Sequence, residues 1–280
     1  MNSVKISLLV SHFWACFVDL VFTILVSPFA LAPLYAGYPM GVLQWMEVGV
    51  AHQAIFTMAS TEAMLVGIMG VYENRFLVLS HYGQWWRPIR IPFFALNYLL
   101  ALVAYFPVYY LVPDQGNAKE WVLERLPCLT PEILSRPLFI VAEDVTLTLH
   151  SSGVASSTIT FEAFVFFVLV TISLNQYGTQ LSKKTIEMQK KFMKSVIFQL
   201  VAPIFYIGYS AKFKYYNQKL TNFSIILIAS HGLVSSITML IAQAPYRQVI
   251  IGYFWFLGRI IGIRRRETEE DQNVFQSRNV

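Results

Sequence analysis

The sequence predicts an all-α membrane protein, a bundle of helices that cross the lipid bilayer. Of the 280 residues, 56% are hydrophobic and 13% are charged, whereas a soluble globular domain carries about a quarter charged residues. A helix needs about 20 mostly apolar residues to cross a hydrocarbon core of about 30 Å. Six stretches meet this requirement: 7–32, 44–72, 91–112, 161–178, 195–213 and 222–244.

Charged and helix-breaking residues separate the first three predicted spans. The first span follows a short start that contains Lys5 and ends at "APLYAGYPMG" (32–41), where glycine and proline interrupt the apolar pattern. The second span ends at "ENR" (73–75), and the third begins after Arg87 and Arg90. We therefore expect a polar turn between each pair of spans.

The last three predicted spans lie after a long polar loop, residues 113–160, which holds six acidic and three basic residues. The fourth span is the shortest and is followed by "GTQLSKKTIEMQKK" (178–191). Pro203 lies inside the fifth span, where proline removes a helical hydrogen bond and favours a kink. Both a hinge at Pro203, which would swing the basic loop before it, and a static kink remain open.

Lysine and arginine are distributed unevenly among the loops, and cytoplasmic loops retain positive charge. Fifteen of these residues lie in the N-terminus, the second and fourth loops and the C-terminal region, against six in the other loops. Both termini are therefore predicted to be cytoplasmic. The apolar run 248–263 contains Arg259 and is short for a span. We expect a bundle over 1–247, and an interfacial helix with a cytoplasmic tail over 248–280.

Motifs of catalysis are missing from the sequence. We find no HExxH, no GxSxG, no phosphate-binding glycine loop and no cysteine pair at metal-ligand spacing. The net charge of +5 is not arranged as a basic stripe with aromatic residues in a polar domain, as a nucleic-acid site requires. The sequence thus predicts no enzyme, no metal, no cofactor and no nucleic-acid partner, and the lipid bilayer is the expected surrounding.

Three titratable residues lie near the predicted mid-bilayer: Asp19, Glu62 and His231. Each lies about 14 to 18 Å inside its span at 1.5 Å per residue. Charged groups are costly there unless they are paired or neutral. One interpretation is a single polar cluster that couples a ligand to helix movement. The other is that each residue finds its own hydroxyl or carbonyl partner in the bundle.

The segment "HGLVSSITMLIAQAPYR" (231–247) resembles the last transmembrane helix of the nematode serpentine chemoreceptors, particularly class H. Three further segments agree in order: "DLVFTILVSPFALAPLYAGYPMGVL" (19–43), "LPCL" (126–129) and "SKKTIEMQKKFMKSVIFQLVAP" (182–203). The resemblance extends from residue 1 to about residue 265. It implies the seven-helix architecture of a G-protein-coupled receptor, in which the first helix would precede residue 1.

The resemblance also implies a function. Receptors of this kind bind a small external molecule and signal to a heterotrimeric G protein by helix rearrangement, in the plasma membrane of sensory neurons. We expect the ligand among the outer halves of the helices, under the 113–160 loop. A transporter or channel, or a non-functional truncated receptor, remains an alternative, although we see neither inverted repeats nor paired broken helices.

Residues for G-protein coupling follow from the motifs that match. Glu73, Asn74 and Arg75 resemble the acidic-then-arginine motif that restrains rhodopsin-like receptors and then contacts the G protein. Their alternative role is an interfacial arginine anchor with a nearby carboxylate. The corresponding end of the last span and the basic loop add further coupling residues: Tyr246, Arg247, Lys183, Lys184, Lys190 and Lys191. The basic loop could equally be attracted to anionic lipid.

Overall fold

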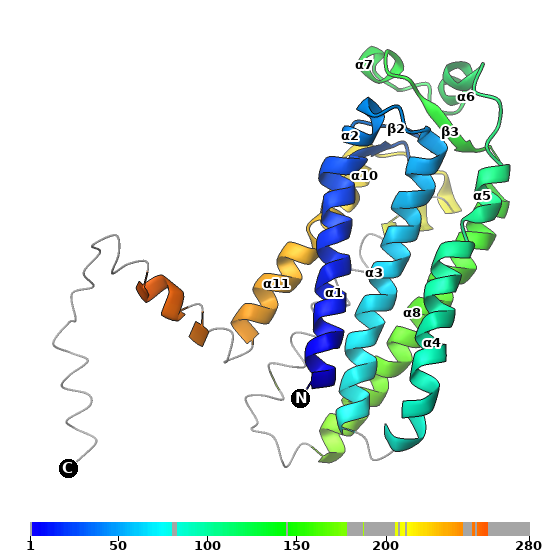
Figure 1. Ribbon diagram of the computed structural model, residues 1–280. Coiled ribbons are helices and arrows are strands. Elements are labelled where there is room, and N and C mark those ends of the chain that lie inside the picture. Colours follow the sequence, from blue (N-terminus) through cyan, green and yellow to red (C-terminus); the bar gives the residue numbers. More distant parts are fainter. Residues whose placement is uncertain are drawn as a thin grey trace, which may run out of the picture. The chain divides into compact units, whose positions relative to one another are not determined.

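A computed structural model of the chain describes residues 2–79, 83–143, 145–177, 187, 205–206, 208–210, 212–242, 248–249 and 251–256 (Figure 1). The chain divides into two units, Met1–Ser236 and Ile237–Val280. The first unit holds the helix bundle and a small sheet. In the second unit, residues 251–256 are helical and their side chains are exposed, and the predicted placement of this segment at the membrane interface stays a prediction.

The helix α3 (Val50–Leu79) is the central element of the bundle. It packs against α1 (Asn2–Leu20), α4 (Gly83–Val103) and α8 (Val145–Tyr177), and these helices run side by side in Figure 1. In its most apolar window, 72% of α3 is buried, against 22 to 28% in the other three spans. Among the described residues, the outer helices therefore leave most of these windows exposed, while α3 is surrounded by protein.

Close packing, rather than the hydrophobic effect, has to hold these helices together, because lipid tails are as apolar as leucine. A Cβ atom at Gly67 of α3 would lie 3.4 Å from Cδ1 of Trp14, so this glycine lets α1 lie close to α3. The core of the bundle gathers buried side chains from four helices: Ala15, Val18, Met64, Leu65, Val66, Ile68, Met69, Tyr72, Ala101, Ile159, Phe166, Val170 and Leu174.

The prediction of an all-α membrane bundle is confirmed. In the described part of the chain, four helices are long and apolar enough to cross a membrane: Ile6–Leu25, Val50–Leu79, Trp85–Tyr110 and Gly153–Asn175. A fifth candidate is the pair α10 (Gln218–Ala229) and α11 (His231–Ala242), which are bent by 49°. The predicted span 195–213 lies largely outside the described residues.

The ends of the spans differ from those that hydropathy predicts. Helical structure in the first span stops at Leu25, the end of the π-helical turn η1 (Val21–Leu25), and residues 28–30 form a strand instead of the predicted helix. The second span begins at Val50 and runs on to Leu79 rather than ending at residue 72. The fourth begins at Val145 instead of 161, because the serines and threonines before residue 161 lower the hydropathy without interrupting the helix.

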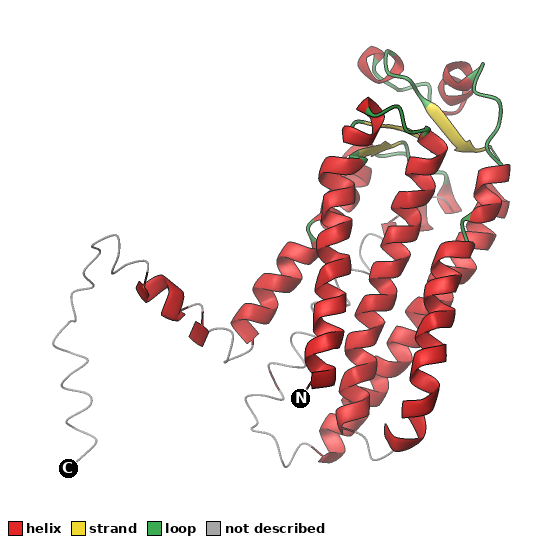
Figure 2. Ribbon diagram, viewed as in Figure 1, coloured by secondary structure: helices red, strands yellow, loops and turns green. Residues whose placement is uncertain are grey.

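A small antiparallel sheet, which the sequence did not predict, closes one end of the bundle (Figure 2). Its strands are β1 (Pro28–Ala30), β2 (Tyr35–Pro39) and β3 (Phe139–Ala142), in the order β1-β2-β3. Gly37 pairs with Ala30, and a side chain at this position would meet the backbone of Phe29. The third strand comes from the long loop after the third span, so the sheet joins that loop to the first one.

The loop that supplies β3 is itself folded. Its helices α6 (Ala118–Arg125) and α7 (Pro131–Leu134) belong to a hydrophobic cluster with the sheet, which includes Leu31, Val122 and Ile140. The amide of Gln115 accepts from Ile140 N at 2.8 Å and donates to Ile140 O at 3.1 Å. A side chain thus satisfies the backbone of β3 as a neighbouring strand would.

Candidate functional site

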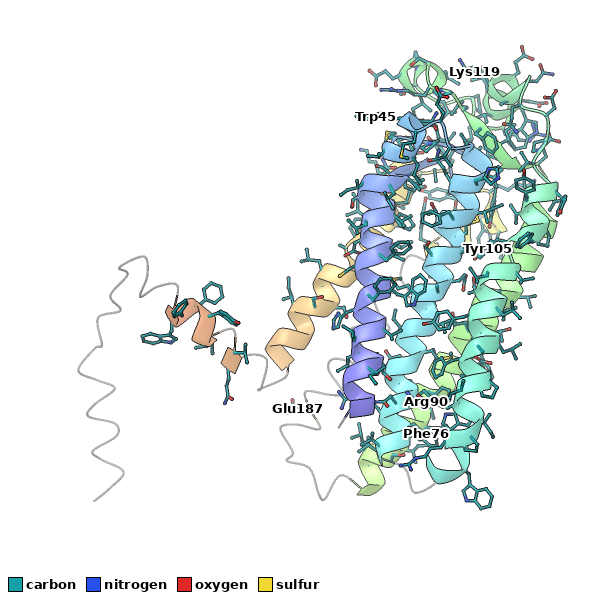
Figure 3. All side chains as sticks on the ribbon, viewed as in Figure 1. Trp45, Phe76, Arg90, Tyr105, Lys119 and Glu187 are labelled. Carbon is teal, nitrogen blue, oxygen red and sulfur yellow. The ribbon has the colours of Figure 1, made fainter. Side chains whose placement is uncertain are left out.

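The bundle has two ends of different character, which Figure 3 marks with labelled side chains. Trp45 and Lys119 lie at the end that carries the sheet, and Phe76 and Arg90 lie at the opposite end. A cavity lies next to the sheet, and a polar network lies at the other end. Phe139 and Val141 of the 113–160 loop line the cavity.

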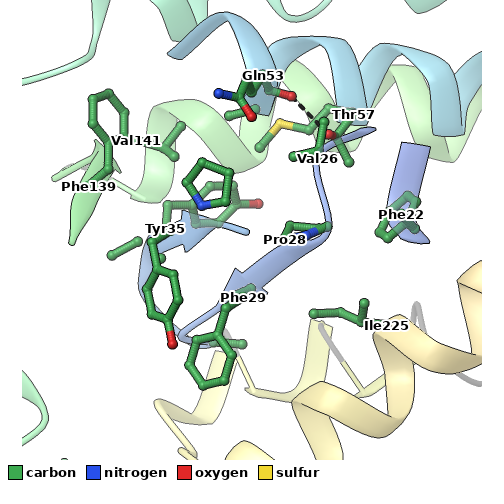
Figure 4. A pocket seen from close by; sticks show the side chains of 18 of the residues that line it. Phe22, Val26, Pro28, Phe29, Tyr35, Gln53, Thr57, Phe139, Val141 and Ile225 are labelled. Carbon is green, nitrogen blue, oxygen red and sulfur yellow. Dashed lines mark hydrogen bonds between the residues drawn. The ribbon is translucent and has the colours of Figure 1, made fainter. Parts of the chain in front are cut away.

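The cavity has a volume of about 340 Å³. Strands β1 and β2 contribute Pro28, Phe29 and Tyr35, while α3 contributes Gln53 and Thr57 (Figure 4). Other walls come from η1, the start of α5 (Phe106–Tyr110), β3 and α10, through Phe22, Tyr105, Phe139, Val141, Thr221, Ser224, Ile225 and Ile228. Ligand sites in proteins are mostly apolar cavities of about 300 to 1,000 Å³, so this cavity fits a small molecule.

Hydroxyl groups are present among these apolar walls. Burial raises the pKa of the Tyr38 phenol, and the positive charge of Arg136 partly offsets this rise. Tyr38, which lines the cavity, therefore keeps its proton at neutral pH and remains a hydrogen-bond donor. Its ring also stacks on Phe29, with 4.9 Å between the ring centroids.

Glu62 is the charged side chain that lines the cavity in the described part of the chain. Only 4% of the residue is exposed. Its Oε1 accepts a hydrogen bond from the Tyr105 hydroxyl at 2.9 Å and another from the Ser156 hydroxyl. Its Oε2 is buried and has no hydrogen-bond partner among the described residues. Neutral groups from the third and fourth spans therefore hold Oε1 of Glu62, while Oε2 has no hydrogen-bond partner among the described residues.

At the opposite end, Glu73 is the centre of a polar network between α3 and α4. It is fully buried, its Oε2 lies 3.1 Å from Nη2 of Arg90, and its Oε1 accepts from Trp86 Nε1 at 2.7 Å. Arg90 also donates to Ser7 of α1 at 3.0 Å and contacts Asn74 Oδ1 at 3.5 Å. One guanidinium thereby connects three helices.

Asp19 lies against the break in the last described span. Its carboxylate accepts from the backbone N–H groups of Gly232, at 3.4 Å, and Leu233. These groups belong to the first turn of α11, where backbone donors lack helical partners and a negative charge is favoured. A Cβ atom at Gly232 would lie 3.0 Å from the carbonyl carbon of Ala15. The glycine allows α1 to lie close enough for Asp19 to cap α11.

The structure brings together only part of the predicted polar cluster. Asp19 contacts the turn that begins at His231, whose side chain is 2% exposed. Glu62 instead has the partners Tyr105 and Ser156. Asp19 and Glu62 thus have separate partners, whereas the buried Nδ1 of His231 has no hydrogen-bond partner among the described residues. Near His231, the Ser236 hydroxyl lies 3.4 Å from Nδ1 of His12.

Among the predicted coupling residues, Glu73, Asn74 and Arg75 lie in α3, one turn before its end. Glu73 pairs with Arg90, an arginine of the next helix. The other predicted coupling and hinge residues lie outside the described residues: Lys183, Lys184, Lys190, Lys191, Pro203, Tyr246 and Arg247. Their roles stay predictions.

Four residues of these sites were not predicted from the sequence. Arg90 and Trp86 were assigned to a loop before the third span, yet they belong to α4 and bind Glu73. Tyr105 and Ser156 lie near the ends of predicted segments and gave no motif. A helical pattern that tolerates serine and threonine would have extended the fourth span to Ser156, and charge pairing between neighbouring spans would have suggested Arg90.

Comparisons with known proteins agree with the resemblance. The family of serpentine type 7TM GPCR chemoreceptors, Srh, matches residues 1–256. Serpentine receptor class H-72 of Caenorhabditis elegans is 23% identical over 278 residues, which cover 91% of this chain and 76% of that relative. No solved structure matches the chain. Because the family match covers most of the sequence, this multi-pass membrane protein belongs to the Srh family of serpentine G-protein-coupled chemoreceptors.

Proposed function

We propose that this chemoreceptor binds a small external molecule in the cavity beside the sheet and signals to a heterotrimeric G protein. The family is one of receptors, not enzymes. The observation that carries the proposal is the apolar cavity of about 340 Å³ among the first, second, third and last described spans. A ligand there would touch helices that have to move relative to one another in signalling.

The coupling residues are proposed at the opposite end of the bundle. Glu73 and Arg90 connect α3 to α4, and Arg90 reaches Ser7 of α1. We propose that Glu73, Asn74 and Arg75 restrain the bundle and contact the G protein only after it repacks, because Glu73 and Asn74 are buried in the packing shown. Further G-protein contacts are proposed at Tyr246 and Arg247, and at the basic loop with Lys183, Lys184, Lys190 and Lys191. The loop would also attract anionic lipid. The expected location is the plasma membrane of sensory neurons.

The mechanism is a shift between two packings of the bundle. A ligand changes this equilibrium only if it binds one packing more tightly than the other. The Glu73–Arg90 pair stabilises the packing that the structure shows. We therefore expect Glu73→Gln to raise ligand-independent signalling, measured with a G-protein reporter and normalised to the amount of receptor at the cell surface.

Ligand binding is tested with a substitution that fills the cavity. Ala54 lines it, whereas Ala95 of α4 is exposed on the surface of the bundle. Cells that express the chain with a G-protein reporter are exposed to a panel of volatile and small water-soluble molecules. Ala54→Trp should abolish the response that Ala95→Trp leaves unchanged. Equal responses of both variants would contradict the proposed cavity, and ligand-evoked current without the G protein would indicate a channel instead.

A further inference from the structure

The cavity pairs an apolar wall with one buried acidic group. Phe22, Val26, Val141 and Ile225 line it, and Glu62 is its charged residue in the described part of the chain. A carboxylate can accept about four hydrogen bonds. Tyr105 and Ser156 supply two of them, both to Oε1. The Glu62 carboxylate thus retains the capacity to accept further donors.

Two other acidic residues of the spans have a positive partner. Glu73 has the Arg90 guanidinium at 3.1 Å, and Asp19 has the N-terminal end of α11. The partners of Glu62 that the structure describes are hydroxyl groups, which carry no charge. A buried carboxylate that stays ionised is normally paired with a positive charge. Among the described residues, Glu62 lacks the kind of partner that the other two have.

We propose that a protonated amine of the ligand is the missing partner of Glu62. The ligand class is then a small molecule with an ammonium group at one end and an apolar body. The ammonium would donate to the Glu62 carboxylate, and a small rotation of the side chain would present Oε2 to it. Hydrogen bonds between two charged groups are shorter and stronger than neutral ones. This inference rests on the proposed function, because it assigns a ligand to the same cavity.

The test compares three probes with the same skeleton: 2-phenylethylamine, 2-phenylethanol and ethylbenzene. The full chain is purified in lipid nanodiscs, and its melting temperature is measured against probe concentration, since a ligand of the folded state raises it. We expect the amine to act at a concentration about tenfold to a hundredfold lower than the alcohol, as a charge-assisted hydrogen bond implies. The hydrocarbon should be weakest.

A matched pair of variants assigns the effect to Glu62. Glu62→Gln keeps the shape and an acceptor for Tyr105 but removes the charge, so the preference for the amine over the alcohol should be lost. Glu162 of α8 also has a buried Oε2 without a hydrogen-bond partner among the described residues, and it does not line the cavity. Glu162→Gln should leave the preference unchanged. The melting temperature without probe shows whether each variant is folded.

Several outcomes would overturn the inference while leaving the proposed function intact. Equal potency of the amine and the alcohol, or no effect of any probe, would show that Glu62 does not select amines. An amine preference that survives Glu62→Gln would place the selecting group elsewhere. The proposed function fails on a different measurement, if Ala54→Trp and Ala95→Trp respond alike in the G-protein reporter assay.

Discussion

Glu62 and Glu73 lie on the same helix in two regions of the molecule, and their carboxylates have different partners. They lie eleven residues apart on α3, close to three helical turns, so they share a face and are about 16 Å apart along the axis. Glu73 binds Arg90 and Trp86, whereas Glu62 binds the hydroxyls of Tyr105 and Ser156 beside the cavity. The first carboxylate has a positive partner, and the second has none among the described residues.

This difference distinguishes a glutamate that holds two helices together from a glutamate that we propose binds a ligand. A carboxylate with a charged partner fixes two helices relative to each other, and removal of the partner leaves a buried charge. A carboxylate with neutral donors beside a cavity leaves the charged partner to come from outside the chain. Three of the four predictions that follow test this contrast, and Gly232→Ala tests the contact of Asp19 with α11; all four unfold the purified protein in a denaturing detergent.

The largest effect is expected for Arg90→Ala, because it leaves Glu73 buried without its positive partner. Loss of one member of a buried pair costs about 3 kcal/mol or more. The control is Arg87→Ala, since Arg87 is an exposed arginine on the same helix and surface charges contribute little. A free energy of unfolding for Arg90→Ala that matches the control would contradict the role of the Glu73–Arg90 pair.

Gly232→Ala is expected to cost about 1 to 3 kcal/mol, the usual effect of forcing extra atoms into a packed site. The new methyl group would meet the Ala15 backbone and the Asp19 carboxylate, which would separate α1 from α11. Gly153→Ala in α8 is the control, because nothing lies within 4 Å of a Cβ atom there. Two equally stable variants would show that the approach of α1 to Gly232 is not required.

The same substitution at both glutamates compares their contributions to the free energy of unfolding. We expect Glu73→Gln to lower the free energy of unfolding by about 1 to 2 kcal/mol more than Glu62→Gln, since hydrogen bonds to charged groups contribute more than neutral ones. In the Glu62→Gln variant, the amide oxygen can still accept from Tyr105 and Ser156. In the Glu73→Gln variant, the neutral amide no longer balances the charge of Arg90. If the two variants lose equal stability, the contrast between the two positions is wrong.

The smallest effect is expected for Tyr105→Phe, which deletes one neutral donor to Glu62. One hydrogen bond contributes about 0.5 to 1.5 kcal/mol. Tyr110→Phe serves as the control, because Tyr110 of α5 is 81% exposed. A Tyr105→Phe variant as stable as the control would mean that the Ser156 hydroxyl holds Glu62 alone.

Much of the fold could be predicted because length and apolar composition are enough to identify a membrane-spanning helix. The helices over 6–25, 50–79 and 153–175 each contain or overlap a predicted stretch. The sheet could not be predicted, since residues 28–32 continue the apolar run of the first span, and β2 pairs not only with β1 but also with β3, more than 100 residues later. Hydropathy indicates which segments are apolar enough to lie in lipid. It does not indicate which backbone N–H groups form hydrogen bonds between strands.

The sites were predictable only as single residues. Asp19, Glu62 and His231 were predicted from their positions near the middle of predicted spans, and the structure gives Asp19 and Glu62 hydrogen-bond partners. Their partners depend on helix rotation and on long-range contact, neither of which composition reveals. Arg90 illustrates this point: its charge helped to predict the orientation of the chain, yet in the structure it points into the bundle to Glu73 and Ser7.

The contact between Asp19 and Gly232 spans 213 residues of sequence, and this separation has a consequence for biosynthesis. Helices are synthesised in sequence order, so the helix that carries Asp19 is made long before the segment that contains Gly232. The backbone amide groups that hydrogen-bond to the Asp19 carboxylate are present only after the segment that contains Gly232 has been made. A chain truncated before Gly232 would lack these amide groups, and Asp19 would lose its contact with α11.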